Sequence, residues 1–270
     1  MWVMTEPLPP LPVDADDHQL AAWLATAAGR VLTELRTGGG ARSTDPTALK
    51  AEGDATSQRF LADALAKSRP HDAVLSEEAA DVSHRLTAER IWIIDPLDGT
   101  REFGEPPRED WAVHVALVVE GRLTAGAVAL PASSLTFATE PPPLLPPRHA
   151  GPIRMLVSRT RPHPAILVAA EALGAIVVPM GSAGAKAMAV VRGDADVYAH
   201  AGGQYEWDSA APAAVAAAAG LHVSGIDGRA LVWNKSDPWS PDLLICRHDL
   251  ADRVVAAVRV ALAESPKSSS

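Results

Sequence analysis

The chain has 270 residues, of which 47% are apolar, so it can bury a sizeable core and form one large domain or two smaller ones. Its 24 basic and 33 acidic residues give a formal charge of −9, which argues against a broad surface for a nucleic acid polymer or an anionic membrane. Cys246 is the single cysteine, which excludes an internal disulfide, and no apolar stretch approaches the ~20 residues that span a bilayer, so we expect a cytoplasmic protein.

The N-terminal half is predicted to begin with two helices and to continue as strands. Apolar residues recur at helical intervals between Asp16 and Gly38, and a second helix is predicted over residues 56–67. Short β-branched runs predict strands at residues 73–75, 91–94, 113–119 and 124–130. Residues 140–152 hold six prolines, which indicates a boundary between an N-terminal subdomain, residues 14–145, and a C-terminal subdomain, residues 152–264.

The C-terminal half is predicted to alternate strands and helices. Strands are expected at residues 155–157, 176–178 and 196–199. Helices are expected at residues 165–173, from about 185, from about 208 and at 249–263. The whole pattern predicts a layered α/β chain in two halves.

The strongest chemical signal follows the apolar run at residues 91–94. Asp95 and Asp98 stand three residues apart at the carboxyl end of this predicted strand, where open α/β sheets bind ligands. Two carboxylates this close repel each other unless a cation lies between them, and hard oxygen ligands suit Mg²⁺. Gly99 permits a sharp turn directly after them. A turn with an Asx cap is the alternative interpretation of this spacing.

Two other acidic segments are candidates for the same site. Glu77 and Glu78 follow the predicted strand at residues 73–75, and two strand ends with convergent carboxylates favour a metal site. Asp208 stands at the start of a predicted alanine-rich helix. Each segment taken alone has an ordinary explanation, since an acidic pair is typical of a solvated helix start and Asp208 of a helix cap.

A phosphate-binding turn is a further candidate at residues 181–186. Gly181, Ser182, small residues and Lys186 lie between a predicted strand and a predicted helix, where N–H groups, a hydroxyl and an ammonium group would suit an oxyanion. The spacing is not that of a Walker A loop. A plain connection between strand and helix is the alternative.

These motifs together resemble a known family. The segment 95–100 (Asp-Pro-Leu-Asp-Gly-Thr), the upstream Ser-Glu-Glu and the downstream Trp-Asp-Ser-Ala-Ala are similar to the inositol monophosphatase superfamily of metal-dependent, lithium-sensitive phosphatases, over about residues 20–260. Residues 98–103 (Asp-Gly-Thr-Arg-Glu-Phe) and 206–208 (Glu-Trp-Asp) resemble its bisphosphate nucleotidase branch, the CysQ-type enzymes. The resemblance implies a five-layered αβαβα sandwich of the inositol monophosphatase/fructose-bisphosphatase type and a homodimer.

The resemblance also implies roles for individual residues. The N-terminal subdomain would bind the metal, and Glu77, Asp95, the Leu97 carbonyl, Asp98 and Asp208 would hold about two or three Mg²⁺ ions. Thr100 would help to orient the attacking water, and Gly99 and Thr100 would present N–H groups to the phosphate. The substrate-binding residues would include Ser158, Ser182, Lys186 and Asp208 as well.

One departure from the family concerns the carboxylate that pairs with the motif threonine. Relatives carry an Asp near the start of the second helix, and our alignment places Ser57 at that position. A serine cannot serve as a base near neutral pH. We therefore expect Asp54, from the loop before the predicted helix, to supply a carboxylate beside Thr100, with Glu52 as a weaker candidate. The alternative is that Asp54 only caps the helix.

The expected function is Mg²⁺-dependent hydrolysis of the 3′-phosphate of 3′-phosphoadenosine 5′-phosphate, a small phosphate ester, to AMP and phosphate. Sulfur assimilation is the pathway that the branch implies. One alternative is an inositol monophosphatase or fructose-1,6-bisphosphatase with the same metal site. Another is a metal-dependent phosphate sensor without turnover, although a sensor has no need of a hydroxyl that orients water.

Overall fold

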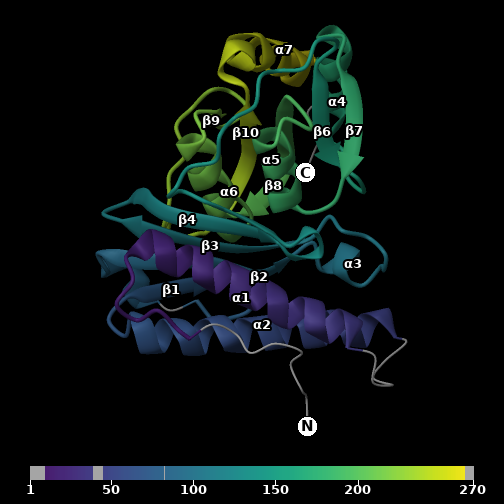
Figure 1. Ribbon diagram of the computed structural model, residues 1–270. Coiled ribbons are helices and arrows are strands. Elements are labelled where there is room, and N and C mark those ends of the chain that lie inside the picture. The colour runs from purple at the N-terminus through teal and green to yellow at the C-terminus, as the bar shows by residue number, and fades with distance from the viewer. Residues whose placement is uncertain (1–9, 39–44, 82, 265–270) are drawn as a thin grey trace.

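The computed structural model describes residues 10–38, 45–81 and 83–264, and it stacks five layers in the order helices, sheet, helices, sheet, helices (Figure 1). The first layer contains α1 (Asp17–Thr37) and α2 (Pro46–Ser68), and the central layer contains α5 (Ala183–Val191) and α6 (Glu206–Ala218). The last layer contains α4 (Pro164–Ala172) and α7 (Ala251–Glu264). The expected αβαβα sandwich is therefore confirmed.

The first sheet has five strands in sequence order, and it brings the ends of β1 and β2 together. β1 pairs with β2 in parallel, whereas each later pair is antiparallel. The carboxyl ends of β1 and β2 consequently lie at the same edge, which places residue 77 near residues 95–98. The strands are β1 (Ala73–Ser76), β2 (Arg90–Asp98), β3 (Ala112–Val119), β4 (Arg122–Leu130) and β5 (Leu135–Ala138).

The second sheet has the order β7-β6-β8-β10-β9 and is mixed. β6 pairs in parallel with β7 and β8, and β10 runs antiparallel to β8 and β9. The strands are β6 (Arg154–Ser158), β7 (Ile176–Met180), β8 (Val197–Tyr205), β9 (His222–Ser224) and β10 (Trp239–Cys246). β8 is longer than the predicted strand and leads directly into α6, so its carboxyl end delivers Asp208 to the space between the sheets.

Three hydrophobic clusters hold the five layers together. One lies between α1, α2 and the first sheet and contains Trp92 and Trp111, which are almost fully buried. Another surrounds α5 and α6 between the two sheets, and the last lies beneath α4 and α7. α5 and α6 contact strands of both sheets, so this central layer fixes the position of one half relative to the other. The lone Cys246 is a buried core residue.

The second helix begins earlier than the sequence pattern predicts. α2 starts at Pro46, after the N-cap Asp45, whose carboxylate accepts a hydrogen bond from Thr47 N at 2.9 Å. The pattern missed this first part because its residues form no continuous apolar stripe, and Gly53 interrupts it. Gly53 is needed there, since a Cβ at this position would lie 2.8 Å from the Phe103 ring. Asp54 therefore lies inside α2, and the expectation of a loop or cap position is wrong.

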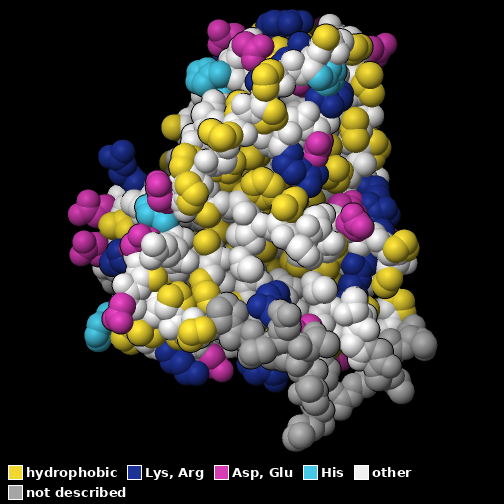
Figure 2. Space-filling view, viewed as in Figure 1, with side chains coloured by type: hydrophobic (Ala, Val, Ile, Leu, Met, Phe, Trp, Pro, Cys, Tyr) yellow, Lys and Arg dark blue, Asp and Glu magenta, His cyan; other side chains and the backbone are white. Residues whose placement is uncertain are grey.

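The face of the molecule drawn in Figure 2 has no broad basic patch, as expected for a chain with a formal charge of −9. Figure 2 shows Lys and Arg side chains scattered among Asp and Glu rather than gathered into one patch. None of the described helices combines the length and the hydropathy that a bilayer crossing requires.

Candidate active site

Asp95 and Asp98 lie where the regular pairing of β2 ends. The register between β2 and β3 shifts between these two residues, and the Asp95 carboxylate accepts a hydrogen bond from Leu97 N at 3.0 Å. Gly99 then adopts a φ of +83°, and a Cβ there would lie 3.1 Å from Asp110 O and from Ser182 Cβ. Only glycine fits this turn without strain. The turn directs both aspartates toward the central helices.

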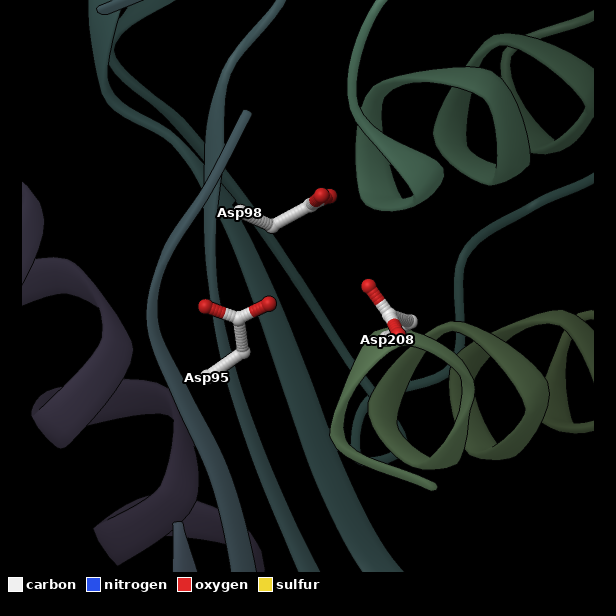
Figure 3. A group of neighbouring side chains, drawn as sticks. All are labelled: Asp95, Asp98 and Asp208. Atoms are coloured by element: carbon white, nitrogen blue, oxygen red, sulfur yellow. The ribbon is translucent and has the colours of Figure 1, made fainter. Parts of the chain in front are cut away.

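Three carboxylates meet in the space between β2 and α6. Asp95, Asp98 and Asp208 each offer an oxygen atom, and these atoms lie within 4.8 Å of one another (Figure 3). Burial, followed by the charge of Asp98, raises the pKa of Asp95 well above its usual value. The same two causes raise the pKa of Asp208 to about 6. An all-oxygen set of mutually repelling carboxylates fits a hard divalent cation such as Mg²⁺.

Asp98 is held by the N-terminus of α5 as well. Its carboxylate accepts hydrogen bonds from Ala183 N at 3.1 Å and from Gly184 N at 2.7 Å, and from the Ser182 hydroxyl at 2.5 Å. Although burial acts in the opposite direction, the His114 charge and these donors lower the pKa of Asp98. Asp98 is therefore anionic across the physiological range, whereas the pKa of its neighbour Asp95 is shifted in the opposite direction.

His114 is a site residue that the sequence interpretation missed. It lies on β3, fully buried, with Nε2 3.1 Å from Asp98 Oδ2 and Nδ1 3.0 Å from the Trp207 carbonyl. Both ring nitrogens face acceptors, which favours the doubly protonated ring. Burial opposes this state, but the charge of Asp98 outweighs it and raises the His114 pKa. The only signal in the sequence was one polar residue within the apolar run at residues 112–119.

Glu77 lies beside the three aspartates but outside their tight group. It follows β1, lines the same cavity as Asp98 and Asp208, and is exposed to solvent. Partial desolvation, then the charges of Asp208 and Glu78, raise its pKa to about 7. The carboxylates of Glu77 and Asp208 thus interact electrostatically although they belong to opposite halves of the chain.

Asp54 and Thr100 are paired in the structure. The Thr100 hydroxyl lies 3.3 Å from Asp54 Oδ1 and 3.0 Å from Leu97 O, so its single proton has two acceptors. Burial, followed by the charge of Glu78, raises the pKa of Asp54 to about 6. Ser57 is buried and donates to Pro96 O at 2.7 Å. The carboxylate that meets Thr100 is thus Asp54, one turn before Ser57 on the same helix.

An open cavity of about 470 Å³ extends from this cluster toward the second sheet. Its lining includes residues from both halves of the chain, among them Gly99, Thr100, Ser158, Ser182, Lys186 and Asp208. Ser158 accepts a hydrogen bond from Arg161 N at 3.2 Å, which shapes the loop after β6. The cavity therefore brings the expected substrate-binding residues together with Glu77, Asp98 and Asp208, whereas Asp95 and Leu97 are not among its lining residues.

The polar groups of Lys186 and Ser182 form hydrogen bonds within the protein, although both residues line the cavity. The Lys186 ammonium donates to the carbonyls of Met180, Gly181 and Ser182 at 3.4, 3.1 and 2.6 Å. Burial lowers the Lys186 pKa to about 8. The Ser182 hydroxyl donates to Asp98, as described above, and also accepts from Ala185 N at 2.9 Å as the cap of α5. The sequence could not show this, because a lysine at a helix start looks the same whether its ammonium faces a ligand or the preceding turn.

Two arginines supply positive charge to the cavity that the sequence interpretation also missed. Arg101 and Arg161 line it, and their guanidinium groups form no ion pair with any of the described residues. By contrast, Arg159 is held by Glu102, with nitrogen–oxygen distances of 3.0 and 2.6 Å. Two unpaired cations in a cavity of an acidic protein attract an anion with more than one charged group.

Sequence comparison finds proteins that are similar to this chain over much of its length. A protein of Mycobacterium leprae called 3′-phosphoadenosine 5′-phosphate phosphatase is 48% identical over 255 residues, which cover 90% of this chain and 93% of that protein. The 3′(2′),5′-bisphosphate nucleotidase CysQ of Escherichia coli K12 is 30% identical over 189 residues, which cover 66% of this chain and 76% of CysQ.

Solved structures agree on the fold. CysQ from Bacteroides thetaiotaomicron superposes with a TM-score of 0.68 at 24% identity and covers 84% of this chain and 96% of its own. Inositol monophosphatase II from Staphylococcus aureus superposes with a TM-score of 0.73 at 18% identity and covers 90% of this chain and 96% of its own. The model of the inositol monophosphatase family matches residues 16–141 and 152–263. This chain belongs to the inositol monophosphatase family.

Proposed function

We propose that this protein is a Mg²⁺-dependent 3′(2′),5′-bisphosphate nucleotidase that hydrolyses the 3′-phosphate of 3′-phosphoadenosine 5′-phosphate to AMP and phosphate. The observation that carries the proposal is one cavity with a carboxylate cluster for cations and two unpaired guanidinium groups for a further phosphate. The relative from Mycobacterium leprae, which matches nine tenths of the chain, is named for this activity and supports it.

The metal ligands that we propose are Asp95, Asp98 and Asp208, with Glu77 and the Leu97 carbonyl at the edge of the group. Bound Mg²⁺ would polarise the phosphate, favour ionisation of water and neutralise the departing alkoxide. Separate contacts hold the three aspartates in place. β2 carries Asp95, the α5 N-terminus holds Asp98, and Asp208 accepts a hydrogen bond from Tyr205 N at 2.6 Å. The N-terminal subdomain supplies two of the aspartates and the C-terminal subdomain the third.

Asp54 and Thr100 are proposed to handle the proton. A water that donates to Thr100 Oγ1 would leave the threonine proton directed at Asp54, and the carboxylate would accept it as the nucleophile forms. The pKa of about 6 suits a base that is ionised near neutral pH and can still take up a proton. Gly99 and Thr100 begin α3 (Thr100–Phe103), where free N–H groups can face phosphate oxygens. Attack would be in line, without a covalent enzyme intermediate.

The substrate's second phosphate is proposed to contact Arg161 and Arg101, which keep free guanidinium groups in the cavity. Lys186 would then contribute through its charge and through its hold on the turn at residues 180–182, rather than by direct contact. Ser158 would act through the loop that carries Arg161. We further propose that the protein is cytoplasmic and that its active form is a homodimer. Light scattering on a sizing column would test the dimer.

A panel assay tests the activity. Phosphate release would be measured at matched Mg²⁺ from 3′-phosphoadenosine 5′-phosphate, inositol 1-phosphate and fructose 1,6-bisphosphate. We expect kcat/KM to be highest for the nucleotide, and we expect Asp95→Asn to lower it by several orders of magnitude. A higher kcat/KM for either sugar or cyclitol phosphate would reject the proposed substrate, and full activity in excess chelator would reject the metal mechanism.

A further inference from the structure

Part of the cavity lining is aromatic. Tyr205, Trp207 and Trp239 all line it, and the Tyr205 and Trp207 rings stack with their centroids 4.6 Å apart and their planes at 11°. Trp239 is 46% exposed and lies opposite Tyr205 in the antiparallel register of β8 and β10. Opposed residues in such a pair share one face of the sheet, so Trp239 extends the surface that Tyr205 begins.

The backbone of β8 is shaped to receive the Trp239 indole. Gly202 and Gly203 have φ angles of +99° and +92°, in a region that side chains disfavour. A Cβ on Gly203 would lie only 2.7 Å from Trp239 Nε1. Because Gly203 carries no side chain, the indole can lie directly against the strand.

The segment that carries Trp239 is anchored to the helix that carries Asp208. Glu206, which is fully buried, accepts hydrogen bonds from Asn234 N at 2.6 Å and from Lys235 N at 2.9 Å. The Lys235 ammonium in turn donates to the Trp239 carbonyl. The position of the indole is therefore tied, through two residues of one connection, to the first turn of α6.

The other half of the chain holds the same segment. Arg85 is fully buried, and its guanidinium donates to Asn234 Oδ1 at 2.7 Å and to Lys235 O at 2.9 Å. It also forms a two-point ion pair with Asp81 at 2.6 and 2.7 Å. Arg85 belongs to η1 (Ser83–Thr87), which follows the segment of Glu77. Trp239 is thus fixed relative to the carboxylates of both halves, as a preorganised binding surface requires.

We propose that Trp239, beside Tyr205, is the surface on which the base of the nucleotide substrate stacks, and that it determines the preference for a nucleotide over a non-aromatic phosphate ester. This inference rests on the proposed bisphosphate nucleotidase activity. The flat indole matches the π-face of a base, whereas inositol and sugar phosphates offer no flat unsaturated ring. A purine covers more of such a surface than a pyrimidine does, so adenine is favoured.

The test compares two substrates that differ only in the base. One is 3′-phosphoadenosine 5′-phosphate, and the other is 1-deoxyribose 3,5-bisphosphate, which keeps both phosphates and the 2-hydroxyl and lacks the base. KM and kcat would be measured for wild type, Trp239→Leu, Trp239→Phe and the control Val232→Ala, whose exposed side chain precedes the anchored segment and does not line the cavity. Melting temperatures of all variants would be recorded.

We expect Trp239→Leu to raise KM for the adenine substrate about tenfold or more, the range that loss of a stacked aromatic side chain produces. KM for the abasic substrate should change by less than about twofold, and Trp239→Phe should retain most of the adenine affinity. Equal effects on both substrates, or none on the adenine substrate, would overturn the inference. Wild-type enzyme that turns over neither bisphosphate would instead reject the underlying activity.

Discussion

At the scale of single residues, the site separates its carboxylates by environment. Asp95, Asp98 and Asp208 are close enough to share a cation, yet the pKa of Asp98 is lowered whereas those of Asp95 and Asp208 are raised. The difference arises because Asp98 alone contacts His114 and the N–H groups of α5. One of the proposed ligands is therefore kept ionised by its neighbours, and a bound cation would lower the pKa of the other two.

The role of Asp54 can be tested by a change that preserves its shape. Asp54→Asn should lower kcat at least tenfold, because the amide cannot accept a proton from the attacking water. Asp54 lies inside α2 and does not cap it, and its charge is repelled by Glu78, so the substitution should not lower the melting temperature. A pH profile from 5 to 8 provides the measurement: the wild type should lose activity below about pH 6 as Asp54 is protonated. The control Glu52→Gln, on the same helix, should retain wild-type turnover, and an unchanged Asp54→Asn profile would contradict the assignment.

The unpaired guanidinium group of Arg161 predicts recognition of the second phosphate. Arg161→Gln removes a charged hydrogen bond that is worth about 1.5–3 kcal/mol, so KM for 3′-phosphoadenosine 5′-phosphate should rise by at least about tenfold. Adenosine 3′-monophosphate lacks the 5′-phosphate, and its KM should shift by less than about threefold. The matched control is Arg253→Gln, an exposed arginine of α7 outside the cavity. Parallel shifts for both nucleotides would show that Arg161 contacts some other part of the substrate.

At the scale of elements, the sequence predicted the features that depend on neighbouring residues and missed those that depend on distant ones. The Asp95–Thr100 turn follows an apolar strand and places Gly99 where only a positive φ fits, so its position could be read from the sequence. The start of α2 could not, because its first turns carry polar residues and its packing against Phe103 involves a distant segment. His114 and Arg85 act through partners more than 90 residues away, at Trp207 and Asn234, and no local pattern announces such pairs.

The contact between α5 and β3 predicts a sharp packing limit. A Cβ on Gly184 would lie 2.1 Å from His114 Nε2, so Gly184→Ala must displace either the imidazole or the N-terminus of α5 that holds Asp98. Overpacking of this kind costs about 1–3 kcal/mol, which corresponds to a fall in melting temperature of about 2–12 °C for a chain of this size. Calorimetry would measure it, and titration calorimetry should show weaker Mg²⁺ binding as well.

Gly174→Ala is the control for the packing prediction. Gly174 also has a positive φ, +63°, which an alanine adopts only with strain, but a Cβ at this position would have no other atom within 4 Å. It should therefore lower stability through backbone strain alone, by about 1–2 kcal/mol, and leave Mg²⁺ binding unchanged. Wild-type Mg²⁺ affinity in Gly184→Ala would contradict the idea that α5 positions Asp98.

At the scale of the whole molecule, the two halves meet around a cluster of like charge. Asp54, Glu77 and Asp95 come from the first half and Asp208 from the second, and the pKa of each is raised. The central layer of α5 and α6 and the Arg85–Asn234 contact join the halves despite this repulsion. The sequence predicted the layers and the acidic motifs, but the balance between repulsion and packing depends on burial, which only the assembled structure defines.

This arrangement predicts how stability without metal depends on pH. Carboxyl groups whose pKa is raised by folding bind protons more tightly in the native state, so their contribution to stability is complete below their unfolded values near 4 and is lost as pH rises through their folded values. For Asp54 and Asp208 these folded values are about 6, and for Glu77 about 7. In chelator, the melting temperature should therefore fall between about pH 5 and pH 7.5.

Mg²⁺ competes with protons for the same oxygens, so the rise in melting temperature at a fixed Mg²⁺ concentration should be larger at pH 7.5 than at pH 5. Asp95→Asn should reduce both trends, because it removes one of the repelling charges and one of the metal ligands. Thermal scans over this pH range, with and without Mg²⁺, provide the measurement. A metal-free protein that gains stability toward pH 7.5 would show that repulsion within the cluster does not limit the stability of the metal-free chain.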